Sequence, residues 1–157
     1  MAQIHVRAWQ AAYRNLLPAQ YLDALRAEDR AARYDFASRN PTGPSTLVAV
    51  DGESICGFAT VARAVQNDAP NYGELCALYV SPEQWGCGIG VALLKAARSR
   101  LLLLGHRQAV LWILRGNARA ERFYQRDGWT SDGLQRTATV WDATVEEVRY
   151  SRDLGRD

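Results

Sequence analysis

The chain has 157 residues, a length typical of one domain that buries a core without a metal or disulfide staple. Its 19 basic and 17 acidic residues are interspersed and give a net charge of +2, which argues against a nucleic-acid or membrane-surface binder. Its three cysteines, Cys56, Cys76 and Cys87, lack metal-ligand spacing, and no apolar run could span a bilayer, so we expect a reduced cytoplasmic protein without metal.

Two helices are predicted at the N-terminus. Apolar residues recur at helical spacing over residues 4–15, beside Trp9 and Tyr13, which lie one turn apart. The segment around Pro18 interrupts this pattern, and we expect a second helix from residue 21 to about residue 37.

A β-hairpin is predicted next. Residues 46–50 and 54–65 have the composition of strands, and Asp51-Gly52 between them tolerates the positive backbone angles of a tight hairpin turn. Residues 40–44 before the hairpin and residues 66–72 after it are polar loops, and we expect the second loop to form a rim of a substrate pocket.

The central stretch predicts a strand, a glycine loop and a helix. Residues 75–80 are an apolar run that ends at Ser81-Pro82, as expected for a strand covered on both faces. The loop then contains Gly86, Gly88 and Gly90. Glycine lets the backbone approach a ligand closely, and the unpaired first-turn N–H groups of the following helix favour a phosphate.

A glycine loop before a helix occurs in several classes of protein. A nucleotide-binding P-loop ends in Gly-Lys-Ser/Thr, which residues 88–91 lack, and a dinucleotide-binding loop has a different glycine spacing near the start of its domain. The alternatives left are a phosphate-binding loop of another kind and a helix start where glycine only permits close packing.

The C-terminal part continues the alternation of strand and helix. Residues 109–114 predict a buried strand, and Asn117 is suited to cap a helix that ends at Gly128. We expect a final pair of strands, one starting at Trp129 and one over residues 145–152, with a poorly specified segment between them.

Two separated segments resemble the GCN5-related N-acetyltransferase (GNAT) superfamily. Its acetyl-coenzyme A loop has the pattern Gln/Arg-x-x-Gly-x-Gly/Ala; Gly88 and Gly90 match the small positions, whereas Trp85 departs from the pattern at the Gln/Arg position. The run Asn117-x-x-Ala-x-x-Phe-Tyr124-x-x-x-Gly-Trp is similar to the family's second cofactor-binding segment. The resemblance covers roughly residues 47–153 and, more loosely, the N-terminal helices.

The resemblance implies an α/β fold, with a single domain over residues 1–157 and a central, mixed and strongly twisted sheet flanked by helices. Family members usually place a strand before the first helix. Here Met1 stands almost at the first helix, which leaves three alternatives for that strand: it is absent, it is replaced by another segment, or it is lost to a late start assignment.

The resemblance also implies an N-acetyltransferase that moves an acetyl group from acetyl-coenzyme A, without a metal, to a primary amine of a small molecule or peptide in a ternary complex. Backbone groups of two splayed strands are expected to pair with the pantetheine arm, and a local basic patch could serve the phosphates. The implied cofactor-binding residues are Leu78, Tyr79, Val80, Trp85, Gly86, Cys87, Gly88, Ile89, Gly90, Val91, Asn117 and Tyr124.

Catalytic and acceptor residues follow from the same resemblance. Tyr124 is the expected general acid and Glu74 a possible general base; the alternatives are a core tyrosine and a solvated strand-end acid. Trp9 and Tyr13 would border the acceptor, unless they belong to the core. A non-catalytic acyl-coenzyme A sensor is the alternative function, and both monomer and homodimer stay open.

Overall fold

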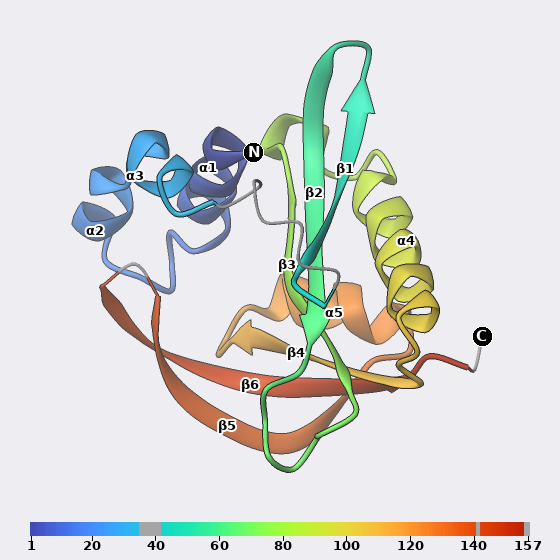
Figure 1. Cartoon of the computed structure of the whole chain (residues 1–157). Helices are drawn as coiled ribbons and strands as arrows, with labels where there is room; N and C mark the ends of the chain where they lie inside the picture. Colours follow the sequence, from blue (N-terminus) through green and yellow to red (C-terminus); the bar gives the residue numbers. More distant parts are fainter. Residues whose placement is uncertain (35–41, 141, 156–157) are drawn as a thin grey trace.

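The computed structural model describes residues 1–34, 42–140 and 142–155. It contains helices on both sides of a six-stranded sheet with the strand order β1-β2-β3-β4-β6-β5 (Figure 1). In chain order the elements are α1 (Ala2–Ala12), α2 (Ala19–Ala24), α3 (Ala27–Ala31), β1 (Ser45–Asp51), β2 (Ser54–Arg63), β3 (Gly73–Val80), the 3-10 turn η1 (Pro82–Gln84), α4 (Ile89–Leu103), β4 (Gln108–Leu114), α5 (Ala118–Arg126), β5 (Thr130–Val140) and β6 (Ala143–Asp153). The predicted α/β fold with a mixed sheet is confirmed.

The sheet opens between its two central strands. All other neighbouring strands are antiparallel, whereas β3 and β4 are parallel and pair only where Gly73 faces Ala109 and Glu74 faces Val110. Beyond these pairs the two strands diverge (Figure 1). The splay that the family resemblance implied is therefore present, and it leaves two strand edges facing a gap.

The main core lies between the sheet and helices α4 and α5. Its buried members include Ala59, Val61, Leu75, Leu93, Leu94, Ala97, Leu101, Leu111, Ile113 and Tyr150. Burial of one large apolar side chain of this kind contributes roughly 1.5–3 kcal/mol to stability. Ala120, Phe123 and Tyr124 pack against this core from α5, so the amphipathic pattern of that helix fixes the direction in which its functional residues point.

An aromatic cluster joins α1 to β2 and β3. The His5 ring stacks on the Tyr79 ring with 4.1 Å between centroids, and Trp9 Nε1 donates a hydrogen bond to the Tyr79 hydroxyl at 3.0 Å. Phe58, which is fully buried, contacts both His5 and Tyr79. Helices α1–α3 thus lie on the side of these strands away from α4 (Figure 1).

The N-terminal helices differ from the expectation. The first helix ends at Ala12, and the predicted second helix is interrupted because Leu25 and Arg26 adopt extended backbone angles. The Arg26 guanidinium donates to the backbone carbonyl of Asp23 at 2.8 Å, which satisfies an acceptor at the end of α2. The expected continuation to residue 37 falls partly outside the described residues. No described residue forms a strand before α1.

The two hairpins were predicted with different success. The Asp51-Gly52 turn between β1 and β2 is confirmed, with φ of +59° at Gly52. The final hairpin is longer than expected, because residues 135–140 continue β5 and pair with β6.

Within the described ranges, no helix combines the length and hydrophobicity that crossing a bilayer requires.

Candidate active site

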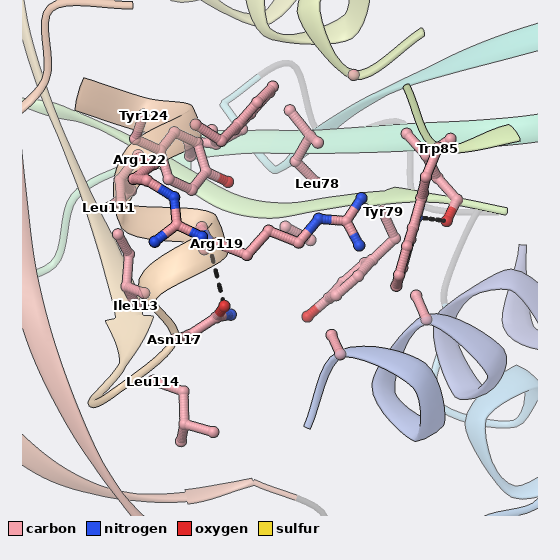
Figure 2. A pocket seen from close by; sticks show the side chains of 18 of the residues that line it. Leu78, Tyr79, Trp85, Leu111, Ile113, Leu114, Asn117, Arg119, Arg122 and Tyr124 are labelled. Carbon is pink, nitrogen blue, oxygen red and sulfur yellow. Dashed lines mark hydrogen bonds between the residues drawn. The ribbon is translucent and has the colours of Figure 1, made fainter. Parts of the chain in front are cut away.

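A cavity of about 590 Å³ opens where β3 and β4 diverge. Its walls come from residues 75–80, residues 111–114, the loop after β3 and the start of α5 (Figure 2). Because the two strands pair only at their N-terminal ends, their facing edges can accept an extended ligand as an additional strand.

Most predicted site residues line this cavity. They are Tyr13, Leu78, Tyr79, Val80, Trp85, Gly86, Gly88, Gly90, Val91, Asn117 and Tyr124. The other predicted residues lie outside the lining. Trp9 is only 5% exposed and belongs to the core beside Tyr79, Ile89 packs against the main core, and Cys87 is exposed outside the cavity.

Glu74 lies directly before the first lining residue of β3. It is half-buried, and its carboxylate accepts a hydrogen bond from Gln66 Nε2 at 3.1 Å. The structure therefore places this predicted general base beside the cavity, with a hydrogen-bond partner of its own.

The glycine loop presents backbone donors at one end of the cavity. Gly86 and Gly88 both have φ of +83°, a conformation that other residues adopt only with strain. The first hydrogen bond of α4 runs from the Ala92 N–H to the Gly88 carbonyl at 3.0 Å, so the N–H groups of residues 88–91 point out of the helix end. This arrangement favours an anion.

Trp85 ties the loop to both neighbouring walls. Its Nε1 donates to the Val80 carbonyl at 2.9 Å, and the Arg119 guanidinium lies over its ring with Cζ 3.6 Å from the ring centroid. A cation from α5 therefore lies against the residue that stands at the Gln/Arg position of the family pattern.

Tyr124 extends from α5 into the cavity (Figure 2). Its ring makes edge contacts with Phe123 and Trp129, at 5.1 and 6.2 Å between centroids. Burial, and to a smaller degree the neighbouring Tyr79 phenol, raise the pKa of Tyr124 above its ordinary value. The phenol thus stays protonated at neutral pH.

Asn117 begins the same helix. Its Oδ1 accepts a hydrogen bond from the Ala120 N–H at 3.2 Å, so the predicted N-cap is confirmed. This bond occupies the oxygen, whereas the Nδ2 donor lies on the other branch of the side chain.

The part of the cavity near the paired ends of β3 and β4 contains Cys76 and Trp112. Cys76 is reached from the cavity, yet desolvation by the surrounding walls raises the pKa of its thiol to about 12, with the Glu74 charge adding to this effect and Arg136 opposing it. The thiol is therefore protonated and a poor nucleophile. The Arg136 guanidinium stacks over Trp112 at 4.1 Å and pairs with Glu147 at 2.6 Å.

One predicted rim is wrong. No residue of the loop over residues 66–72, all of which the structure describes, lines the cavity, because this loop joins β2 to the paired end of β3. Its Asp68 carboxylate accepts from Arg149 Nη2 of β6 at 2.6 Å.

Sequence reasoning missed three arginines that line the cavity from α5. They are Arg119, Arg122 and Arg126. Positions three and seven residues beyond the first lie on one face of a helix. That spacing, in a helix already expected to border the cofactor, was the signal that could have found them.

Comparison with known proteins agrees with this geometry. The family model described as Acetyltransferase (GNAT) family matches residues 7–129. An uncharacterized N-acetyltransferase of Bacillus subtilis (strain 168), YuaI, is 30% identical over 119 residues, which are 74% of this chain and 66% of that protein, so the chain spans slightly less than two thirds of this relative.

Solved structures show the same fold. A GCN5-related N-acetyltransferase from Rhodopseudomonas palustris superposes with a TM-score of 0.73 at 18% identity, covering 97% of this chain and 86% of that one. The PaiA N-acetyltransferase of Thermoplasma acidophilum, solved in complex with coenzyme A, has a TM-score of 0.68 at 18% identity and covers 97% and 89%. With a family model matching most of its length, the chain belongs to the GNAT acetyltransferase family.

Proposed function

We propose that the chain is an N-acetyltransferase that transfers the acetyl group of acetyl-coenzyme A to a primary amine of a small molecule or peptide. The observation that carries this proposal is the divergence of β3 and β4 beyond Glu74 and Val110, which opens a cavity between a helix N-terminus and Tyr124. The coenzyme A bound to the Thermoplasma acidophilum relative supports a coenzyme A ligand.

The residues present fit this substrate. The N–H groups of residues 88–91 would hold the diphosphate, and the free edge of β3 over residues 78–80 would pair with the pantetheine arm. Asn117 would contribute its Nδ2, because its Oδ1 is already used in the helix cap. Leu78, Val80 and Leu111 give the strand walls an apolar lining, suited to the alkyl parts of the arm.

The proposed reaction is direct transfer within a ternary complex. The amine nitrogen bonds to the thioester carbonyl carbon while the carbon–sulfur bond breaks, and the departing sulfur takes a proton. Tyr124 is suited to donate that proton, because its side chain extends into the cavity and a phenol carries its proton at neutral pH. Glu74 would accept the proton lost by the amine through an intervening water, since its side chain lies beside the cavity.

We propose that the acceptor lies against Tyr13, Cys76 and Trp112. These residues line the cavity away from the glycine loop: Tyr13 directly follows α1, Cys76 belongs to β3 and Trp112 to β4. The face of an aromatic ring attracts an ammonium group and also suits an apolar substituent next to the amine.

A catalytically silent acyl-coenzyme A sensor is the second candidate. The observation that favours it is the position of Glu74 outside the cavity lining. Calorimetric titration of the purified chain with coenzyme A, followed by thiol release from acetyl-coenzyme A across a panel of amines and peptides, separates the two. We expect binding together with amine-dependent release. Binding without release on every amine would favour the sensor, and no binding of any coenzyme A species would contradict both.

A further inference from the structure

We infer that Arg119 is a phosphate ligand of the acyl-coenzyme A and that Trp85 holds its guanidinium in place. This inference rests on the proposed function, and it assigns to α5 the cation that the loop lacks. Trp85 departs from the Gln or Arg of the family pattern, and on this inference Arg119 of α5 supplies the positive charge instead.

The geometry brings two separate segments together across the cavity. Trp85 stands in the loop before α4, and Arg119 is the second residue of α5. Figure 2 shows the Arg119 side chain extended across the cavity toward Trp85. The indole is itself fixed by its bond to the Val80 carbonyl at 2.9 Å, and the guanidinium carbon lies 3.6 Å from its centroid.

Contact with the indole leaves the guanidinium able to bind an anion. Its central carbon lies over the ring, and the group carries five N–H donors on three nitrogens, which one ring cannot occupy together. A guanidinium can therefore remain over Trp85 and donate to a phosphate at its edge. Contact with Trp85 also restrains the Arg119 side chain before the ligand arrives, which lowers the side-chain entropy that the phosphate contact costs.

The charge of Arg119 is not neutralised by a carboxylate within the described part of the chain. None of the ion pairs found between residues that the structure describes includes Arg119. Partial desolvation lowers the pKa of its guanidinium, which is the direction expected for a cation without a compensating anion. A phosphate would supply that anion.

The rest of the cavity wall formed by α5 is also positively charged. Arg122 and Arg126 line the cavity from the same face of α5, although the whole chain has a net charge of only +2. Positive charge is thus concentrated on one wall beside a helix N-terminus, an arrangement that selects a polyphosphorylated ligand. Of the three arginines, Arg119 is the one that Trp85 joins to the glycine loop.

The test compares donors with and without phosphates. We measure kcat/KM for acetyl-coenzyme A and for acetyl-pantetheine, together with the Kd of coenzyme A, in the wild type and in Arg119→Gln. Loss of a charged hydrogen bond predicts an about 10- to 100-fold rise in Kd and an equal fall in kcat/KM for acetyl-coenzyme A, with unchanged kcat/KM for acetyl-pantetheine. The salt dependence of coenzyme A binding should also become weaker.

Further variants separate the phosphate contact from general effects. Trp85→Leu should give a smaller loss of the same phosphate-dependent kind, and Arg119→Lys should recover part of it. Lys95→Gln removes an exposed cation of α4 outside the cavity and serves as the charge control. Thermal unfolding of each variant checks that the fold is intact.

Two results would overturn the inference while leaving the proposed function in place. One is an unchanged Kd of coenzyme A in Arg119→Gln, and the other is an equal loss with acetyl-pantetheine, which would indicate a role in shaping the cavity. If the wild type binds no coenzyme A, the proposed function itself is wrong and this inference is wrong with it.

Discussion

Tyr124 has the two properties that a proton donor inside the cavity needs. Its position is fixed, because its ring packs against Phe123 and Trp129 and its helix is anchored in the main core. Its hydroxyl carries a proton at neutral pH, because the ordinary pKa of a phenol lies near 10 and burial raises it further. A tyrosine used only for packing would need the ring but not the hydroxyl, and this difference can be measured.

Tyr124→Phe keeps the ring and removes the proton donor. We expect kcat to fall about 10²- to 10⁴-fold, as is typical when a general acid is removed, with an unchanged Kd for coenzyme A. Steady-state kinetics and calorimetry give the two constants, and circular dichroism checks the fold. An unchanged kcat would assign Tyr124 to the core alone.

At the scale of elements, the cavity depends on how closely β3 and α4 pack. Gly73 begins β3 next to α4, and a Cβ built on it would lie 2.5 Å from Leu101 Cδ2. Leu101 is fully buried in the main core, so its side chain has no free space into which to turn. Glycine at this position therefore allows the paired end of β3 to lie against the helix.

Gly73→Ala should destabilise the protein by about 1–3 kcal/mol, because the added methyl group overpacks the core. Urea unfolding followed by circular dichroism measures the change. Gly155→Ala is the matched control, since a Cβ there would meet nothing closer than Asp153 Oδ1 at 3.5 Å. Equal stabilities of the two variants would show that the core yields to the methyl group.

At the scale of the whole molecule, His5 connects the layer of α1–α3 with the sheet. Its side chain is only 3% exposed and stacks on Tyr79 of β3. Its Nδ1 accepts a hydrogen bond from Arg30 Nε of α3 at 3.0 Å, which requires that nitrogen to be unprotonated. Burial first, and the Arg30 charge second, lower the pKa of His5 from its ordinary 6.5 to about 3.

This shift predicts a loss of stability in mild acid. Between pH 6.5 and about pH 3 the unfolded chain takes up a proton on His5 that the folded chain does not, so the free energy of unfolding should fall by about 1.4 kcal/mol per pH unit below 6.5. Urea unfolding at pH 7.5 and pH 5.5 measures the loss, and His5→Asn should show less of it. Equal losses in both proteins would place the acid sensitivity elsewhere.

The sequence predicted those features whose cause lies within a few neighbouring residues, and it did not predict those that depend on contacts between distant segments. The turn at Gly52 and the glycine loop before α4 follow from backbone angles that glycine adopts easily. The break between α2 and α3 lies at Leu25 and Arg26, where the backbone is extended, and neither Gly nor Pro marks it in the sequence. The role inferred for Arg119 depends on a contact with Trp85, two segments away, so the residue type alone did not indicate it.

The stacking of Arg119 on Trp85 also gives the protein an optical property. Indole emission responds to charges and solvent beside the ring, and Trp85 is half-buried at the loop where the phosphates should arrive. Trp9 and Trp129 are buried in the cores and far less open to such changes, whereas Trp112 lines the cavity on β4 with Arg136 over its ring. Trp85 is therefore an intrinsic fluorescent reporter beside the glycine loop, where the proposed phosphates would bind.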